Sequence, residues 1–532
     1  MAHTEREIER KYESDGGGLP DLTGVPGVAA VVDRGVAHLD ATYYDTADGR
    51  LAASSVTLRR RTGGSDAGWH LKLPVAPGVR DEIRAPLGDD VPGALAALVR
   101  SRVRDRPLLP VVRLRTDRDV RHLVDADGRL LAEVSADAVR ADRLTGAART
   151  VRWTEIEAEL AEGGDPAFLD TVGARLLAAG LRPGAHASKL ARALAATAPE
   201  QRREPEAPPP VTAGDHVLAH LRAQRDALVA LDPAVRRDLP DAVHRMRVAT
   251  RRLRGAFRSY AKILDPAVTG PVGAELARLA AELGAGRDQE VLTERLAAAL
   301  DDLPPALVTG PVRARLRTWS RARYGASRRR LAAVLDGDRH LALLDALDAL
   351  VADPPLRGPA AHPPDRALGE AVRKDVKRLS ARIGRALALP PGPERDLALH
   401  AARKQAKRTR YAAEAAGAAL GDPARALARS VKSLQELLGD HQDSVMTREA
   451  LRELAGEAHA AGESTFTYGV LYGREEHRAA RDEAALPGVW EAVRARTGRE
   501  GCGGPRRPGY AEWSPLSAHE GSVRCLPKPP SL

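Results

Sequence analysis

Hydrophobic and polar residues alternate in short segments up to about residue 195. The alternation is clear at 69–73 (Trp-His-Leu-Lys-Leu), 131–134 (Leu-Ala-Glu-Val) and 155–159 (Glu-Ile-Glu-Ala-Glu). A period of two is typical of β-strands, and turn sequences such as Ala-Asp-Gly separate the segments. Ala and Leu recur with helical spacing around 92–103 and 166–179. The first part of the chain is therefore predicted to be a set of short strands with two helices.

The charged positions of these segments come in pairs with a period of two. The pairs are Glu7/Glu9, Arg59/Arg61, Arg113/Arg115 and Glu155/Glu157. Since alternate residues of a strand share a face, each pair projects from one side. In an open sheet such faces would be solvated, whereas in a closed antiparallel barrel they would line a polar lumen. The repetition favours the lumen, with solvated strands as the alternative.

Residues 213–495 show a different pattern, in which Ala and Leu recur at spacings of three and four among many arginines. This spacing predicts long amphipathic helices. Residues 197–212 are rich in Pro and charge and are expected to be a linker, and 496–532 are Gly/Pro-rich and expected to be disordered. We therefore expect an α+β multidomain protein: a barrel over 1–196 and an all-α bundle over 213–495.

The helical part contains an internal repeat. After His244 and again after His400, basic residues follow at three, seven, eight and ten positions. Each copy is followed by Leu-Gly-x-x-x-Asp, which ends at Asp288 and at Asp443. The two His-to-Asp separations are 44 and 43 residues. Matching offsets at two places predict a duplicated helical bundle with pseudo-two-fold symmetry.

Within each copy the basic residues fall on one helix face. Neighbouring like charges on a helix repel one another, so the face needs an anion or acidic side chains beside it. Asp288 and Asp443 could supply part of that compensation, which would make the stripe an ordinary solvated face. The duplication, with a histidine leading each copy, favours a groove for a polyanion.

Composition supports an anionic partner. The 532 residues, too many for one ordinary domain, carry a formal charge of +10 and have a pI near 9.8. Only 10 of the 82 basic residues are lysines, and the first 200 residues contain only Lys11, Lys72 and Lys189. Against this bias toward arginine, each lysine is expected to mark a place where a compact ammonium is needed.

Several classes of protein are disfavoured. No apolar run reaches 18 residues and the first residues lack an apolar core, so neither a membrane span nor a signal peptide is expected. Cys502 and Cys525 are the only cysteines, which excludes a disulfide framework and fits a reducing cytoplasm. No spacing of His and Cys resembles a zinc site.

Glu7-Ile8-Glu9-Arg10-Lys11 resembles the ExExK signature of the CYTH domain, the triphosphate tunnel metalloenzyme superfamily. The resemblance spans about residues 3–195 in the order of the family. It continues through Tyr43-Tyr44-Asp45-Thr46, Leu58-Arg59-Arg60-Arg61, Leu71-Lys72, Arg80-Asp81-Glu82, Arg113-Leu114-Arg115, Glu133 with Asp137, Glu155-Ile156-Glu157 and Ser188-Lys189-Leu190.

The resemblance implies a charged tunnel that hydrolyses phosphoanhydrides by positioning and charge neutralisation. The implied substrate-binding residues are Lys11, Arg59, Arg61, Lys72, Arg113, Arg115 and Lys189. Glu7, Glu9, Glu155 and Glu157 would hold Mg²⁺ or Mn²⁺, whose hard character suits carboxylate oxygens. Lys11 and Asp137 are the implied catalytic residues. Tyr44, Asp45, Glu82 and Glu133 are expected to orient these groups or to be structural.

The helical part, over about 213–480, resembles the CHAD domain, a family associated with polyphosphate binding and polyphosphate granules. The resemblance includes the late segment 468–473. It implies a polyphosphate-binding surface formed by His244, Arg247, Arg251, Arg252, His400, Arg403, Lys404, Lys407, Arg408 and Lys432. His441 stands where the first repeat has Gly286, so the two copies need not be equivalent.

These expectations lead to two hypotheses. The first is a metal-dependent inorganic triphosphatase, producing diphosphate and phosphate, joined to a polyphosphate-binding bundle in the cytoplasm. The alternative is a non-catalytic protein of polyphosphate granules, or an enzyme for thiamine triphosphate or ATP. Apart from Trp69 no aromatic is clearly placed to stack on a base. Nucleic acid is an unlikely but possible partner of the basic bundle, and the sequence leaves the oligomeric state open.

Overall fold

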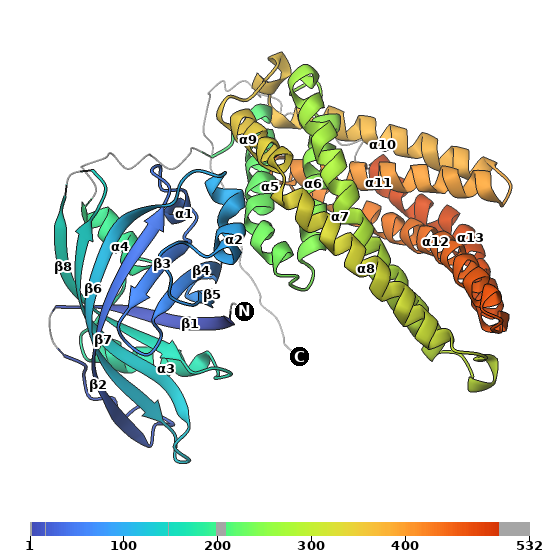
Figure 1. Ribbon diagram of the computed structural model, residues 1–532. Helices are drawn as coiled ribbons and strands as arrows, with labels where there is room; N and C mark the ends of the chain where they lie inside the picture. The colour runs from blue at the N-terminus through green and yellow to red at the C-terminus, as the bar shows by residue number, and fades with distance from the viewer. Residues whose placement is uncertain (1–2, 16–17, 147, 198–208, 500–532) are drawn as a thin grey trace, which may run out of the picture.

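The computed structural model describes residues 3–15, 18–146, 148–197 and 209–499. It contains a β-barrel followed by a bundle of long helices, shown side by side in Figure 1. Most of the expected linker and nearly all of the expected C-terminal tail lie outside the described residues. None of the described helices is long and apolar enough to cross a membrane.

Strands β1 to β8 close into an antiparallel barrel in the order β5-β4-β3-β2-β6-β7-β8-β1. Closure depends on β1, since its residues 3–8 pair with β5 and its residues 9–14 pair with β8. The predicted closed barrel is thus confirmed. The strands are β1 (His3–Ser14), β2 (Ala30–Asp45), β3 (Thr57–Thr62), β4 (Gly68–Ala76), β5 (Val79–Ala85), β6 (Leu109–Val124), β7 (Leu130–Arg143) and β8 (Thr150–Leu160), with β9 (Arg182–Pro183) added beside β1.

Helices cover the outside of the barrel wherever the strands turn apolar residues outward. Helix α2 (Gly93–Val103), next to the short α1 (Arg50–Ala53), packs Leu95 and Val99 against Leu58, Trp69 and Leu71. Helix α3 (Ala167–Ala178) packs on the outer residues of β8 in the same way. Both helices lie where Ala/Leu spacing predicted them.

Helix α4 (Lys189–Thr197) fills one end of the barrel. Its Leu190 and Ala193 are buried against Tyr43, Val112 and Leu114, which face the inside of the barrel at that end. The helix contacts β6, β7 and β8. Because α4 begins at Lys189, the apolar plug places this ammonium group at the inner end of the barrel cavity.

The second part of the described chain is entirely helical. It consists of α5 (Ala213–Arg236), α6 (Ala242–Ser259), α7 (Pro266–Asp301), α8 (Val312–Asp336), α9 (Asp338–Ala352), α10 (Pro364–Ala388), α11 (Pro393–Leu420), α12 (Asp422–Ala460) and α13 (Phe466–Arg499), with short 3₁₀ turns at Pro305–Leu307 and Gly358–Ala361. Buried Leu and Ala side chains from most of these helices form one large core. The predicted all-α region is confirmed.

The barrel and the bundle are in contact through α2 and α5. Arg104, just after α2, pairs with Asp345 at 3.2 Å and Asp348 at 3.1 Å on α9. Arg237, just after α5, pairs with Asp81 on β5 at 2.8 Å. Charged side chains therefore connect the outer wall of the barrel to the bundle.

Candidate functional site

The barrel encloses a cavity of about 680 Å³ whose lining is dominated by charged side chains. They come from all eight strands of the barrel, from the loops that contain Asp66 and Glu162, and from the start of α4. Its charged residues include Glu5, Glu7, Glu9, Lys11, Arg34, Arg59, Arg61, Asp66, Lys72, Arg80, Glu82, Arg84, Arg118, Glu133, Glu157, Glu159, Glu162 and Lys189. The pairs Glu7/Glu9 and Arg59/Arg61 thus project into the lumen, as the period-two pattern predicted.

All three lysines of the first 200 residues line this cavity, and each contacts a glutamate. Lys72 Nζ lies 2.6 Å from Glu7 Oε2, and Lys11 Nζ lies 3.0 Å from Glu9 Oε2. Lys189 Nζ lies 2.6 Å from Glu157 Oε1. The scarcity of lysine therefore did identify groups of the cavity wall.

One side of the cavity carries a cluster of positive charge on β3. Arg59 lies 3.6 Å from Glu82 and donates to the Tyr43 hydroxyl at 3.2 Å, and these neighbours raise its pKa against the effect of burial. Arg61 contacts Asp66, and burial, with the charges of Arg59 and Arg118, lowers the pKa of Arg61 to about 9. A cation whose charged form is disfavoured by its surroundings is stabilised by an incoming anion.

The opposite side of the cavity is rich in negative charge, because several glutamates lie close together there. In the strand register Glu159 lies opposite Glu9, and Glu133 lies opposite Glu159. Burial raises the pKa of Glu159 to about 7, and the charges of Glu7 and Glu9 add to the effect against Lys72 and Arg118. Burial also raises the pKa of Glu7. Clustered carboxylate oxygens of this kind suit a hard divalent cation.

Glu157 and Glu155 lie elsewhere than expected. Glu157 is surrounded by cations, with Arg118 at 2.7 Å, Lys189 at 2.6 Å and Lys11 in direct contact. Glu155 lies at the end filled by α4, where its Oε1 forms an ion pair with Lys189 at 2.9 Å and its Oε2 accepts from the Trp153 indole at 2.6 Å. It is not among the residues that line the cavity, whereas Glu159, on the same face of β8, is. The metal-binding role expected of Glu155 stays a prediction.

Arg113 and Arg115 lie on the outer face of the barrel, so the expectation that they bind substrate in the lumen is corrected. Arg113 forms a bidentate pair with Asp40, and Arg115 lies 3.6 Å from Asp142. On β6 the even-numbered residues face inward, and Arg118 is the arginine of this strand that reaches the cavity. Both faces of β6 carry charges, so the charged pair alone could not reveal its direction.

Asp137 is fully buried and does not line the cavity. Arg118 donates to both of its oxygens at 2.8 and 2.7 Å, and Lys189 lies at 2.8 Å. Despite its burial these cations lower its pKa. A carboxylate held in this way orients two cations, and the catalytic role expected of Asp137 stays a prediction.

Three further residues singled out in the sequence, Asp45, Tyr44 and Trp69, have structural contacts outside the lumen. Asp45 accepts from the backbone N–H groups of Leu51 at 2.8 Å and Ala52 at 2.9 Å, so it is structural. Tyr44 stacks on Trp69 outside the lumen, with ring centroids 5.0 Å apart. Trp69 is fully buried beneath α2 and cannot stack on a ligand in the cavity.

Sequence reasoning missed several residues of the cavity wall as binding groups. Arg118, Arg80, Arg84 and Glu159 all project into the lumen. Glu159 follows Glu155 and Glu157 with the same period of two, so continuing the alternation by one step would have found it. Arg80 and Arg84 flank Glu82 with the same period, which is the corresponding signal on β5.

The bundle contains a second charged site, built by the two repeats. Arg247 on α6 forms a bidentate pair with Asp288 on α7, at 2.7 and 3.2 Å. In the second repeat Arg403 on α11 lies 3.8 Å from Asp443 on α12. Gly284 lies so close to Arg247 that an added Cβ would meet its guanidinium at 3.1 Å. The repeated Leu-Gly-x-x-x-Asp sequence thus provides room and an acid for each arginine.

The cations of the two repeats converge where α6 meets α11. Burial, with the charges of Arg403, Arg251 and Arg247, lowers the pKa of Lys407 to about 6. Burial and the charge of Arg247 lower the pKa of Arg251 to about 10. We call Arg247, Arg251, Arg403 and Lys407 the basic cluster. Among the described residues, the acids paired with this cluster are Asp288 and Asp443. Its three arginines and the lysine whose charged form is disfavoured therefore favour an anion.

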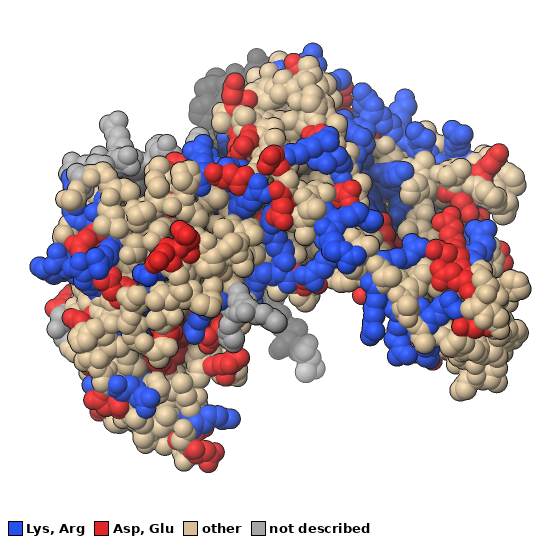
Figure 2. Space-filling model, viewed as in Figure 1, with Lys and Arg blue, Asp and Glu red and all other residues tan. Residues whose placement is uncertain are grey.

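The other expected polyphosphate-binding residues are spread more widely. His244 lies three residues before Arg247 on α6, and Lys404 follows Arg403 on α11, so both are at the edge of the basic cluster. His400 Nδ1 contacts Gln442. Arg252 pairs with Glu414 at 2.9 Å, and Lys432 pairs with Glu436 at 3.4 Å on an exposed face. Arg408 points toward α10, where it pairs with Asp375 at 3.2 Å. Figure 2 shows many Lys and Arg side chains over the bundle.

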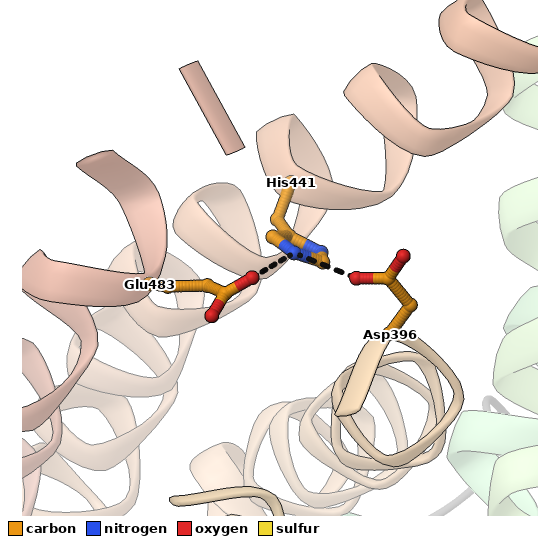
Figure 3. Close-up of side chains that lie close together, drawn as sticks. All are labelled: Asp396, His441 and Glu483. Atoms are coloured by element: carbon orange, nitrogen blue, oxygen red, sulfur yellow. Dashed lines mark hydrogen bonds and ion pairs between the residues drawn. The ribbon is translucent and has the colours of Figure 1, made fainter. Parts of the chain in front are cut away.

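A third group of titratable side chains lies between α11, α12 and α13 (Figure 3). His441 Nε2 lies 3.3 Å from Asp396 Oδ1 and 3.2 Å from Glu483 Oε1. The other carboxylate oxygens pair with Arg448 at 3.3 Å and Arg395 at 3.0 Å. Each carboxylate thus already has a cationic partner, and the group is a satisfied ion-pair network that joins three helices of the second repeat.

Comparison with known proteins gives matches over both parts of the chain. The family model of the CYTH domain matches residues 5–192, and that of the CHAD domain matches residues 219–452. Two Mycobacterium tuberculosis proteins, uncharacterized protein MT2285 of strain CDC 1551 / Oshkosh and uncharacterized protein Rv2226 of strain ATCC 25618 / H37Rv, are each 41% identical over 513 residues. The match covers 92% of this chain and 97% of each relative.

Solved structures also resemble the chain. PptA from Streptomyces chartreusis is 22% identical, with a TM-score of 0.46, over 53% of this chain and 100% of its own. HpAC1 from Hippeastrum, for which a dominant triphosphatase activity is described, is 16% identical, with a TM-score of 0.21, over 36% of this chain and 96% of its own.

Proposed function

Because the chain belongs to the proteins that join a CYTH domain to a CHAD domain, we propose that its barrel hydrolyses inorganic triphosphate and its bundle binds polyphosphate. The CYTH match and the charged barrel together support an activity on triphosphate compounds. The observation that carries the finer proposal is the separation of charge in the cavity. Arg59 and Arg61 concentrate positive charge on one side, where the charged form of Arg61 is disfavoured, and Glu159 shares negative charge with Glu7 and Glu9 on the other.

This separation suits a phosphate chain and a divalent cation bound side by side. The phosphate oxygens would accept from Arg59, Arg61 and Lys72, three cations that line the cavity. Glu7, Glu9 and Glu159 would hold Mg²⁺ or Mn²⁺, and their shared negative charge fits such an ion. The bound metal would supply neutralisation of charge at the phosphate oxygens.

The protein's own residues would position the substrate. Phosphoryl transfer depends on alignment and on stabilisation of charge that moves to the leaving oxygen. Glu157 holds Lys11, Arg118 and Lys189 in one place, so these donors need little reorganisation when a phosphate arrives. Asp137 fixes Arg118 and Lys189 from behind. Glu159, with a pKa of about 7, could take up or release a proton near neutral pH.

A test of this proposal measures phosphate release from tripolyphosphate with Mg²⁺ or Mn²⁺. The full chain should turn over only with metal, and Glu7→Ala and Lys11→Ala should lose activity. Arg115→Met, which changes an arginine on the outer face of the same barrel, should retain it. Unchanged turnover in both Glu7→Ala and Lys11→Ala would overturn the proposal. A panel of tripolyphosphate, long polyphosphate, ATP and thiamine triphosphate then ranks the substrates.

The second candidate is a non-catalytic protein in which the barrel only captures ends of polyphosphate chains. It is favoured by Glu157, whose carboxylate is engaged by three cations and would serve a binding site equally well. Tight polyphosphate binding without hydrolysis across Mg²⁺, Mn²⁺ and Ca²⁺ would select it. An organic triphosphate ranks lower, because Trp69 lies outside the lumen.

For the bundle, the basic cluster supports binding of polyphosphate, and with it association with polyphosphate granules. Three arginines and Lys407, from two helices, converge with two aspartates beside them. Long polyphosphate should bind the full chain and should bind Arg251→Gln more weakly. Competition with duplex DNA at moderate salt tests the partner, since DNA that displaces polyphosphate would contradict the proposal.

A further inference from the structure

A cavity of about 910 Å³ lies where the barrel meets the bundle, outside both sites described above. The barrel contributes residues of β1, α1, β4, β5 and α2 to its walls, and the bundle contributes residues of α5, α6 and α9. In Figure 1 this is the region where α2 faces α5. The cavity is therefore formed by both domains together.

The walls of this cavity carry an excess of positive charge. Seven arginines and three aspartates line it, with no other charged residue. The arginines are Arg6, Arg50, Arg102, Arg104, Arg225, Arg237 and Arg245. The three aspartates are already engaged: Asp81 by Arg6 and Arg237, Asp348 by Arg104 and Arg225, and Asp226 by Arg225.

Arg102 is the residue that points to a missing partner. Its side chain is 8% exposed, and its Nε and Nη1 have no hydrogen-bond partner among the described residues. Burial lowers its pKa. The nearest acid of the bundle, Asp232, is bound by Arg236 at 2.7 Å. A buried guanidinium without a partner is costly, so its retention in the wall of a cavity indicates a ligand.

Arg245 adds a second available cation. It is exposed on α6 at the bundle side of the same cavity, and within the described part of the chain it forms no ion pair. Arg102 and Arg245 belong to different domains. An anion that reached both guanidinium groups would therefore connect the barrel to the bundle.

We propose that this interdomain cavity binds a phosphate-bearing anion. The planar guanidinium group of arginine can donate two hydrogen bonds to the oxygens of one phosphate. Several guanidinium groups around one cavity favour a ligand with more negative charge than a single carboxylate carries. The volume exceeds that of one orthophosphate, and apolar residues such as Leu73, Val75 and Leu239 form part of the wall. The ligand class is a compound with one or more phosphate groups, either an inorganic oligophosphate or a nucleotide.

The site is independent of the barrel lumen. Arg6 and Asp81 lie on the outer face of β1 and β5, whereas their neighbours Glu7 and Glu82 project into the lumen. The barrel wall thus separates two sites that are one residue apart in sequence. An anion in the interdomain cavity would compete with Asp81 for Arg6 and Arg237 and would hold the two domains together.

The direct test is a crystal of the full chain grown with orthotungstate, a phosphate analogue that is located by its anomalous scattering. The expected result is a tungstate within hydrogen-bonding distance of Arg102. Tungstate in the lumen or at the basic cluster, with none in the interdomain cavity, would overturn the inference and leave the proposed function untouched. Tungstate in the interdomain cavity alone would support the inference separately from the proposed function.

A solution test uses Arg102→Met, which keeps an unbranched side chain with most of its apolar stem and removes its charge. Without added anion, Arg102→Met should melt at the same temperature as wild type or higher, because a buried unpaired charge is gone. Added orthophosphate, tripolyphosphate or ATP should raise the melting temperature of wild type more than that of Arg102→Met. The affinity of this site for the anion should be at least about tenfold lower in the variant. Comparing the three ligands distinguishes an inorganic phosphate from a nucleotide.

Arg425→Gln, which removes an exposed arginine paired with Asp422, is the matched control and should behave as wild type. If Arg102→Met lowers the melting temperature without anion and leaves the gain from each anion unchanged, Arg102 is only structural. That result would contradict the proposal.

Discussion

Glu159 lies directly opposite Glu9 in the register of β8 and β1, so two carboxylates share one patch of the lumen wall. The neighbouring pair on the same strands, Glu157 and Lys11, is compensated by contact between opposite charges. The Glu157–Lys11 pair thus joins opposite charges, whereas the Glu159–Glu9 pair brings two negative charges together. We therefore expect a bound metal on the Glu159 side of the lumen.

We predict that metal affinity rises with pH through the pKa of Glu159, about 7. Metal binding must displace the proton, so affinity for Mn²⁺ should increase about tenfold from pH 6 to pH 8. Calorimetric titration at the two pH values measures this. Glu159→Gln should bind Mn²⁺ more weakly and with little dependence on pH, whereas Glu436→Gln, an exposed change on the bundle, should retain both the affinity and the slope. An unchanged slope in Glu159→Gln would assign the proton to another group.

The same residue predicts how metal removal affects stability. Glu159 keeps its proton in the folded state up to about pH 7, while the unfolded chain releases it near 4.5. The free energy of unfolding of the metal-free protein therefore loses a contribution as pH rises from about 4.5 through 7. Thermal melting with a chelator should show this loss, and added Mn²⁺ should reverse it above pH 7. A metal-free stability that is flat over this interval in wild type would contradict the prediction.

Arg61 and Arg60 provide a matched pair on β3, since one side chain faces the lumen and the other faces outward toward Gly88. Arg61→Met should reduce kcat/KM for tripolyphosphate by about a hundredfold, the loss expected for one donor to a transition-state oxygen. The fold should be retained, because burial and neighbouring arginines disfavour the charge of Arg61 and its partner Asp66 is partly exposed to solvent. Arg60→Met should keep kcat/KM within about twofold. Equal losses in the two variants would show that side-chain direction is irrelevant.

Lys407 predicts pH-dependent binding of polyphosphate to the bundle. Its pKa of about 6 means that the folded protein holds it neutral at pH 7, while the unfolded chain holds it charged up to about 10.5. This group therefore lowers the stability of the ligand-free protein progressively as pH falls from about 10.5 to 6. A bound polyanion restores the charge, so affinity should be at least about tenfold higher at pH 6 than at pH 8.

His244 and His400 lie near the cluster and are also titratable. The Lys407→Met variant therefore shows which group causes the pH dependence. Lys407→Met should lose most of the pH dependence, and Lys404→Met should keep it. Proton uptake on binding, measured by calorimetry in buffers of different ionisation enthalpy, gives an independent readout. Absence of proton uptake by wild type at pH 7 would contradict the assignment to Lys407.

Alanine substitutions at two glycines of α7 distinguish the effect of packing at the basic cluster from the effect of helix propensity. A Cβ at Gly284 would meet the Arg247 guanidinium at 3.1 Å, whereas a Cβ at Gly270 would meet nothing within 4 Å. Gly270→Ala should stabilise the bundle by about 0.5–1 kcal/mol and leave polyphosphate affinity unchanged. Gly284→Ala should displace Arg247 and weaken polyphosphate binding. Melting temperature and affinity, measured together, test the pair, and equal affinities would show that the position of Arg247 is unimportant.

The sequence predicted the architecture well because periodicity is a property of each segment by itself. Alternation over residues 1–195 and the duplicated offsets after His244 and His400 required no knowledge of distant contacts. The direction of a strand face is different, since it depends on which neighbours the barrel provides. On β6 both faces carry charge, so the placement of Arg113 outside and Arg118 inside could not be predicted from that strand alone.

The interdomain cavity shows a second limit of the sequence. Arg102 belongs to a helix with ordinary Ala/Leu spacing, and Arg245 lies within the first basic repeat. Neither residue has a local pattern that relates it to the other. Their relation depends on how α2 docks on α5, which is a tertiary property. The metal-like trio Asp396, His441 and Glu483 was invisible for the same reason, because its members come from three helices.

The convergence of α6 and α11 has an evolutionary consequence. Each repeat contributes only half of the basic cluster, Arg247 and Arg251 from one copy and Arg403 and Lys407 from the other. A hypothetical ancestor with a single copy would have possessed half a site and would have completed it by pairing with an identical chain. Gene duplication and fusion would then have made that pairing permanent. The fusion also freed the copies to diverge, as His441 in the place of Gly286 illustrates.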